Sequence, residues 1–180
     1  IIEIRKMRGI PTDIIEMPFV ITSDKGIELL LIERPKRISS FLRERVSTGI
    51  KDLDKLLEGG LPKGVQVLIV GPSGSGKSML SLTIALNNAS RDLKTLYISF
   101  DESSEQLEIK AKSLGYDVSS LPIQFLGLNV TAYTYGTLTY TIVHTIETYK
   151  PQIVVFDGLT QIAKMYGYKE LWFNTVNLST

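Results

Sequence analysis

From residue 48 onwards, short apolar runs alternate with longer stretches in which apolar residues recur at helical spacing. Short, almost continuous apolar runs occur at residues 65–70, 95–100, 123–128 and 153–156. Stretches with helical spacing follow the first three runs, at 77–88, at 105–114 and up to about residue 149. Continuous apolar strands that alternate with helices indicate a parallel sheet covered on both faces. The pattern therefore predicts an α/β fold with buried strands at these four positions.

The first 47 residues have a different pattern. Three segments with β-strand character, at residues 1–8, 19–22 and 27–32, are separated by turns rich in Gly, Pro, Asp and Ser. The charged stretch 33–47 is interrupted by Pro35 and has no continuous apolar face, which is typical of a linker. This part of the chain therefore predicts a small β segment followed by a connection.

A short amphipathic helix is predicted after this linker. It starts at residues 48–49 and ends at the glycine pair 59–60. Its apolar face consists of Ile50, Leu53, Leu56 and Leu57.

Composition narrows the functional classes. The chain has 180 residues, of which 43% are hydrophobic, enough for one compact core. It has no cysteine and only one histidine, His144, which excludes disulfides, thiol catalysis and a metal site built from several histidines. A formal net charge of +1 provides no long-range attraction to nucleic acid or anionic membranes. No apolar run approaches the roughly 18 residues of a membrane helix, so we predict a cytoplasmic protein without a membrane span.

Both ends of the sequence suggest a portion of a longer protein. The chain begins at Ile1 without a methionine, already in strand-like alternation, and it stops at Thr180 without a helix stop signal. We therefore expect further sequence on both sides.

Residues 71–78, with the sequence GPSGSGKS, fit the phosphate-binding P-loop pattern in full. In such a loop, small residues let backbone N–H groups surround the phosphates, Lys77 reaches the β- and γ-oxygens, and Ser78 can bind Mg²⁺. The helix that follows points its positive end at the same anion. A glycine-rich turn that matches by chance is the alternative, but the predicted strand before and helix after the loop favour a site for ATP with Mg²⁺. The predicted nucleotide contacts are Gly71, Ser73, Gly74, Ser75, Gly76, Lys77, Ser78 and Met79.

Three acidic residues follow predicted strands. Asp157 ends the apolar run 153–156 and is predicted to hold the metal together with Ser78; the alternative is that Asp157 and Gly158 only form a turn. Asp101 and Glu102 directly follow the run 95–100, at the carboxyl edge of the sheet where ligands bind. A carboxylate there can orient or deprotonate the water that attacks the γ-phosphate. The alternative is a structural role beside a helix capping box at residues 103–106.

These residues resemble the RecA superfamily and, more narrowly, the KaiC-like ATPases. The segments that carry the resemblance are residues 48–64, the P-loop, 100–107, 111–117 and 150–160. The resemblance implies a RecA-like P-loop NTPase core, with a mostly parallel sheet flanked by helices and a small β segment before it. It also implies Mg²⁺-dependent ATP hydrolysis at the subunit interfaces of a homo-oligomeric, hexameric ring, with Lys77 at the reacting phosphates. Asp101 stands where the family usually has the first of two glutamates, so we assign water activation to Glu102, with Asp101 assisting.

The same resemblance suggests a domain layout. Residues 1–32 look like the closing strands of a preceding KaiC-type domain, 33–47 a linker, and 48–180 a RecA-like ATPase domain that is incomplete at its C-terminal end. We expect the N-terminal strands to stand apart from the sheet that contains residues 65–70. In the family, basic residues of the corresponding strand reach the nucleotide of the adjacent subunit, which would be Lys6 and Arg8 here. The alternative is that both are exposed strand charges.

Two other functions share the same motifs. A DNA recombinase of the RecA/RadA type has a similar core, although nucleic acid is not an expected partner from the net charge. An ATP-gated assembly or signalling module with little turnover is the third interpretation. The sequence does not identify a protein partner, and it does not assign autokinase activity.

Overall fold

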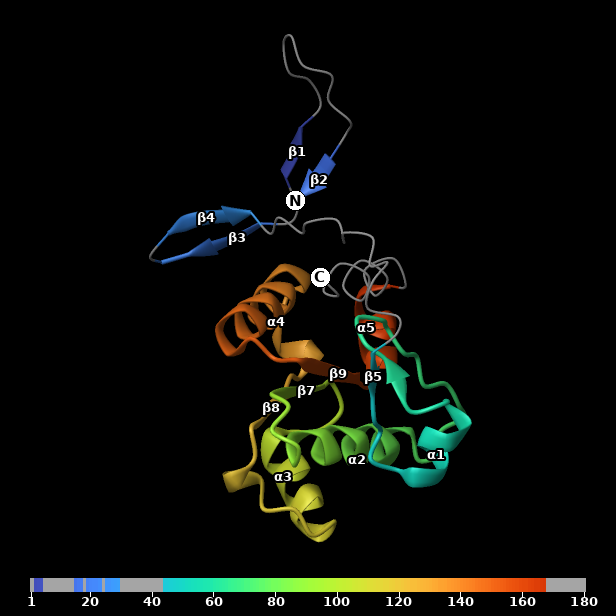
Figure 1. Cartoon of the computed structure of the whole chain (residues 1–180). Helices are drawn as coiled ribbons and strands as arrows, with labels where there is room; N and C mark the ends of the chain where they lie inside the picture. Colours follow the sequence, from blue (N-terminus) through green and yellow to red (C-terminus); the bar gives the residue numbers. More distant parts are fainter. Residues whose placement is uncertain (1, 5–14, 18, 24, 30–43, 168–180) are drawn as a thin grey trace.

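The computed structural model describes residues 2–4, 15–17, 19–23, 25–29 and 44–167. Its centre is a three-stranded parallel sheet with the order β8-β7-β9. The strands span Thr95–Ser99 in β7, Ile123–Gly127 in β8 and Ile153–Asp157 in β9. In Figure 1, α4 lies on one side of this sheet, and α2 and α3 lie on the other. The predicted α/β class with a helix-flanked parallel sheet is therefore confirmed.

Central strand β7 is buried on both faces, which explains its continuous apolar run. Leu96 and Ile98 pack with α4, which spans Tyr135–Tyr149, and with α5, which spans Leu159–Tyr166. Tyr97 points to the opposite face and packs with α2, spanning Lys77–Ala89, and with α3, spanning Ser104–Ser113. Alternation of side chains along one strand thus produces two cores, one on each side of the sheet.

The strand register brings the chemically interesting residues to one edge. Ser99 at the end of β7 pairs with Asp157 in β9 and with Gly127 in β8. Asp101 and Glu102 directly follow β7, so they lie at the same carboxyl edge as Asp157. This placement agrees with the expectation from the sequence.

Two of the flanking helices begin with side-chain caps. Ser103 and Gln106 form the predicted capping box at the start of α3. Thr134 and Thr137 form another at the start of α4. Short 3-10 turns at Val118–Ser120 and Val130–Ala132 complete the connections. None of the helices in the described ranges is long and apolar enough to cross a membrane.

The predicted buried strand at residues 65–70 is wrong. No strand is formed there, and Val65, Val67, Leu68 and Val70 expose between 42% and 80% of their surface. Apolar, β-branched composition favours an extended backbone, but a strand also needs a partner, and pairing is a non-local property. Among the described strands, β9 pairs only with β7, and residues 65–70 pair with none.

The helix predicted after residue 48 is present, but its predicted apolar face is not buried. Helix α1 spans only Lys51–Leu56, buries none of its residues, and leaves Leu56 82% exposed. Polar contacts hold it instead. Asp54 accepts hydrogen bonds from the Thr48 N–H and the Thr48 hydroxyl, both at 2.7 Å, and from the Ser47 hydroxyl. These hydrogen bonds keep the pKa of Asp54 below its ordinary value. The bond from Ser47 has the largest effect, followed by those from Thr48.

A two-stranded ribbon not predicted from the sequence joins the chain before α1 to the chain after it. Strand β5, Arg45–Val46, pairs antiparallel with β6, Leu61–Pro62. The Arg45 guanidinium also donates to the carbonyls of Leu57 and Gly60, at 2.9 and 3.0 Å. Residues 44–47 are therefore attached to the α1 unit, whereas 33–43 lie outside the described residues.

The N-terminal strands pair with one another. β1, Ile2–Ile4, pairs with β2, Ile15–Met17, and β3, Phe19–Thr22, pairs with β4, Gly26–Leu29. Neither pair joins the three-stranded sheet. The β3 strand nevertheless contacts α4, where Phe19 lies against Gly136, and Val20 is buried. The division into a preceding domain, a linker and an ATPase domain stays a prediction.

Candidate nucleotide-binding site

The predicted P-loop lies at the N-terminal end of α2. Gly76 is the N-cap of this helix and has a φ of 86°, a left-handed conformation that favours glycine. No side chain caps the N-terminus of α2 with a hydrogen bond, whereas α3 and α4 both begin with capping boxes. The loop residues Gly71, Ser73, Gly74 and Ser75 are all exposed, and Met79 in the first turn is 46% exposed. The uncapped, positive end of α2 therefore faces solvent through a glycine-rich loop, which suits an anion.

Lys77 lies close to the loop. Its Nζ donates to the carbonyl of Gly71 at 3.0 Å and to that of Pro72 at 2.7 Å. An ammonium group in this position is directly beside the backbone that would surround a phosphate chain.

Ser78 and Asp157 meet at the edge of the sheet. The Ser78 hydroxyl donates to Asp157 Oδ1 at 2.9 Å, although the two residues are 79 positions apart in sequence. A hydroxyl and a carboxylate are oxygen ligands of the kind that Mg²⁺ prefers, and Mg²⁺ usually completes its shell with phosphate oxygens and water. The donor set formed by these two residues fits a magnesium ion bound together with a nucleotide.

A third group at this contact, Tyr97, was not predicted from the sequence. Its hydroxyl donates to Asp157 Oδ2 at 3.1 Å and lies 2.9 Å from the Ser81 hydroxyl and 3.4 Å from the Ser78 carbonyl oxygen. Tyr97 is fully buried. Burial, and next the nearby Asp157 charge, raise its pKa well above the ordinary value, so the phenol keeps its proton and remains a donor. The available signal was a hydroxyl-bearing residue within an apolar strand, because a buried Tyr O–H usually has a partner.

Asp101 lies against the turn that follows β9. Its Oδ1 accepts a hydrogen bond from Gln161 Nε2 at 2.6 Å. Gly158, with a φ of 76°, provides the space for this contact, because a Cβ there would overlap the Asp101 carboxylate. Asp101 therefore connects the end of β7 to the start of α5.

Glu102 has a different partner. It forms an ion pair with Lys110, two turns along α3, and its backbone N–H donates to the Ser99 hydroxyl at 3.1 Å. The other carboxylate oxygen, Oε2, is buried and has no hydrogen-bond partner among the described residues. Its charge is close enough to add to the raised pKa of Tyr97. Lys110 and Gln161 were both missed from the sequence, since neither position has a local pattern that identifies its partner.

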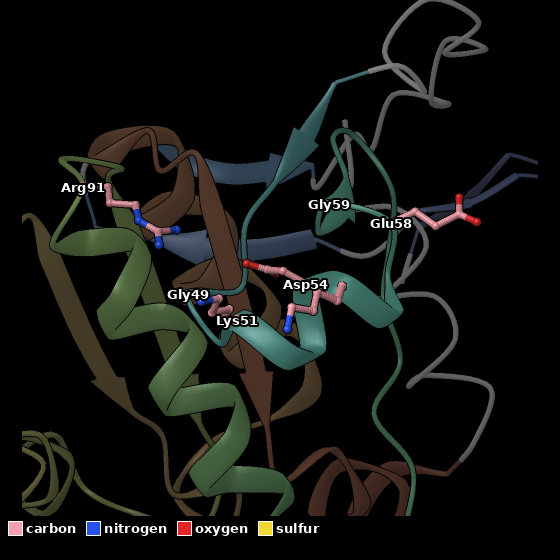
Figure 2. Close-up of a pocket in the computed structure, with 7 residues that line it drawn as sticks. Gly49, Lys51, Asp54, Glu58, Gly59 and Arg91 are labelled. Atoms are coloured by element: carbon pink, nitrogen blue, oxygen red, sulfur yellow. The ribbon is translucent and has the colours of Figure 1, made fainter.

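An open hollow lies at the opposite end of α2 and is separate from the P-loop. Figure 2 shows Arg91, just beyond the helix, on one side of it, with Lys51 and Asp54 of α1 on another. A helix of 13 residues is about 20 Å long, which separates this hollow from Lys77. The predicted residues Lys6 and Arg8 lie outside the described residues.

The fold and this site define a class. A parallel sheet covered by helices on both faces, with a P-loop helix beside an acidic strand end, is the architecture of a RecA-like P-loop core. The family model described as ATPase: KaiC matches residues 46–171. The chain therefore belongs to the KaiC ATPase family.

The chain is also similar to individual proteins, two of them KaiC proteins and one a DNA repair protein. The chain is 31% identical to the circadian clock protein KaiC2 of Synechocystis sp. over 166 residues, which cover 89% of this chain and 29% of that protein. It is 29% identical to the circadian clock oscillator protein KaiC of Nostoc sp. over 167 residues, 91% of this chain and 32% of the relative. It is 36% identical to the DNA repair protein RadA of Aquifex aeolicus over 119 residues, 66% of this chain and 24% of the relative. The matched region thus spans about a third or less of each relative.

Proposed function

We propose that this chain binds ATP with Mg²⁺ and hydrolyses it to ADP and phosphate. The observation that carries the proposal is the 2.9 Å contact between Ser78 and Asp157. It joins the first turn of the P-loop helix to the end of strand β9. A glycine-rich turn that matched the pattern by chance would not be expected to place Asp157, at a strand end, against Ser78, the residue after the loop lysine. Family membership supports the same conclusion.

In this proposal, each part of the site has one role. Backbone N–H groups of residues 71–76 and the start of α2 bind the phosphates. Lys77 places its ammonium on the β- and γ-phosphates, and Ser78 and Asp157 hold Mg²⁺. When bound, Mg²⁺ neutralises charge on the β- and γ-oxygens. Met79, exposed in the first turn, contributes to the surface of the nucleotide site.

Glu102 is the proposed base for the attacking water, with Asp101 assisting. Two observations favour Glu102. First, one of its carboxylate oxygens is buried without a hydrogen-bond partner in the described region. Second, its charge helps to raise the pKa of Tyr97, and Tyr97 contacts Asp157, the proposed metal ligand. Each carboxylate has one oxygen bonded to a side chain, Glu102 to Lys110 and Asp101 to Gln161, but the Asp101 carboxylate also packs on Gly158. A carboxylate with an unused oxygen is better prepared to accept a proton from water.

The assembly belongs to the proposal as well. We place hydrolysis at the subunit interfaces of a homo-oligomeric ring of hexameric type, in the cytoplasm, with Lys6 and Arg8 acting on the nucleotide of the adjacent subunit. In this arrangement, residues 1–32 close a preceding domain and residues 48–180 begin the next. The mass of the protein in solution with and without ATP tests the ring.

Two alternative functions each have an observation in their favour. Similarity to the DNA repair protein RadA of Aquifex aeolicus favours a recombinase-type ATPase, which would bind single-stranded DNA in a salt-sensitive way. The ion pair between Glu102 and Lys110 favours a module that binds ATP with little turnover, because a paired carboxylate is a poorer base.

One set of measurements separates these functions. ATP binding is measured by calorimetry with Mg²⁺ and again with EDTA, for the native chain and for Ser78→Ala, and phosphate release is measured in parallel. Mg²⁺-dependent binding with turnover supports the proposal, and Ser78→Ala should lose most of the Mg²⁺ dependence. Binding without turnover supports the assembly module. Turnover that rises with single-stranded DNA supports the recombinase. Absence of ATP binding by the native chain rejects all three.

A further inference from the structure

Tyr97 stands apart from the loop, the lysine and the acidic residues that the sequence identifies. It lies in the central strand, on the face covered by α2, and none of its side chain is exposed. Its ring packs edge-on against Phe125 with a centroid distance of 6.1 Å and an interplanar angle of 67°. The ring therefore has a fixed place in the core, and the hydroxyl at its end has a fixed position near the sheet edge.

The Tyr97 hydroxyl lies close to both residues of the proposed metal site, Asp157 and Ser78. It donates to Asp157 Oδ2 at 3.1 Å, while the other oxygen of the same carboxylate accepts from Ser78 at 2.9 Å. It also lies 2.9 Å from the hydroxyl of Ser81, which can donate to it while Tyr97 donates to Asp157. Both oxygens of Asp157 are thus oriented by neighbouring hydroxyls, one from α2 and one from β7.

We propose that Tyr97 is a positioning residue that holds the Asp157 carboxylate against Ser78 and thereby sets the affinity of the site for Mg²⁺. This inference rests on the proposed function. A carboxylate at a strand end can rotate about its side-chain torsions, and one hydrogen bond from Ser78 leaves the second oxygen free to turn away. The Tyr97 hydroxyl removes that freedom from a rigid, buried position. Groups that orient metal ligands typically change metal affinity by about 10–100-fold when removed.

Tyr97→Phe deletes only the hydroxyl and keeps the ring against Phe125. Tyr116→Phe is the matched control, since Tyr116 donates to Asn87 Oδ1 at 2.7 Å near the other end of α2 and makes no contact with Asp157. Ser81→Ala is a second test variant, because it removes the partner of the Tyr97 hydroxyl without touching the ring. All three are compared with the native chain for folding by circular dichroism.

The readout is metal binding, measured apart from turnover. Mn²⁺ is titrated into each protein with a saturating non-hydrolysable ATP analogue and followed by electron paramagnetic resonance. Fluorescent ATP binding is measured separately in EDTA. For Tyr97→Phe we expect about a 10-fold weaker Mn²⁺ affinity with unchanged metal-free nucleotide affinity. Ser81→Ala should show a smaller shift in the same direction, and Tyr116→Phe should match the native chain.

Different failures have different meanings. If the native chain binds neither the nucleotide nor Mn²⁺, the proposed function fails and this inference fails with it. If the native chain binds both and Tyr97→Phe has native Mn²⁺ affinity, only the role of Tyr97 is rejected. If Tyr97→Phe does not fold, the Ser81→Ala titration decides, and native Mn²⁺ affinity in that variant rejects the proposal.

Discussion

The two ends of α2 are stabilised in opposite ways. At the C-terminal end, buried Asn88 donates from Nδ2 to the carbonyls of Ser47 and Ile84, at 3.0 and 2.9 Å. Asn87 beside it donates to the Thr48 carbonyl and accepts from the Tyr116 hydroxyl. At the N-terminal end, Gly76 supplies no side-chain cap and the loop before it is exposed.

This difference separates stability from function within one helix. Side-chain amides at the C-terminal end donate within the chain, and these donor bonds contribute to folding, while the buried Asn88 Oδ1 has no partner among the described residues. At the N-terminal end, no side chain of this protein caps the positive end of the helix dipole, so a ligand can bind there, and the residues at this end contribute little to the core. Substitutions at the N-terminal end should therefore change ATP binding or turnover and leave stability intact. Substitutions at the C-terminal end should have the opposite effect.

The largest effect is expected from Glu102→Gln. Loss of the proposed base should lower the rate of phosphate release by about 10²-fold or more, with ATP affinity retained. Stability should change little, since the lost ion pair with Lys110 is partly exposed. Steady-state phosphate release and ATP binding are the measurements. Asp101→Asn is the comparison and should lose less activity; the reverse order would make Asp101 the base.

Lys77→Ala tests the N-terminal end directly. It removes the cation beside the loop carbonyls of Gly71 and Pro72. We expect a loss of at least about 2 kcal/mol in ATP or transition-state binding, in the range for charge-assisted contacts, or roughly 30-fold. The melting temperature without nucleotide should stay native. Native ATP binding and turnover in this variant would refute the ATPase assignment.

Asn88→Ala tests the opposite end of the helix. Removing its two buried donor bonds should lower the free energy of unfolding by about 1–3 kcal/mol, measured by urea denaturation. ATP affinity should remain native once the protein is folded. Ser90→Ala is the control, because Ser90 is exposed and its hydroxyl bonds only to the Leu86 carbonyl one turn earlier. Equal losses in both variants would show that the buried contacts add nothing.

Asp54→Ala gives the smallest effect and a pH signature. The folded pKa of Asp54 is lowered by its bonds to Ser47 and Thr48, so its stabilising contribution is complete above the unfolded pKa of about 3.9. That contribution is lost as the pH falls through the lowered folded value. The melting temperatures of native and Asp54→Ala protein should therefore differ near neutral pH and converge in strong acid. Asp52→Ala, on the same helix but exposed, is the control and should have a melting temperature close to that of the native protein at neutral pH.

Much of the fold follows from local pattern. The predicted helix at 77–88 is observed as Lys77–Ala89, and the strand at 95–100 as Thr95–Ser99, because burial on both faces gives a clear apolar run. The capping box at Ser103 also follows from residue types alone. Residues 65–70 have the same kind of run, yet no strand forms, since a partner strand is not encoded locally.

The site divides in the same way. Lys77, Ser78 and Asp157 were chosen because a loop pattern and a strand end are visible in sequence, and the structure brings Ser78 and Asp157 into contact. Tyr97, Lys110 and Gln161 were missed because their partners are set by the packing of separate elements. The roles of Lys77, Ser78 and Asp157, like those of Asp101 and Glu102, stay predictions for the experiments above.

We expect residues 65–70 to promote association between chains in concentrated solution. The sequence VQVLIV is uncharged, rich in β-branched residues and free of proline and glycine, and four of its side chains are largely exposed. Such six-residue segments stack readily into intermolecular β-structure when they are accessible. Purified chain should therefore aggregate more readily with increasing concentration, and a single charge such as Leu68→Lys should improve its solubility.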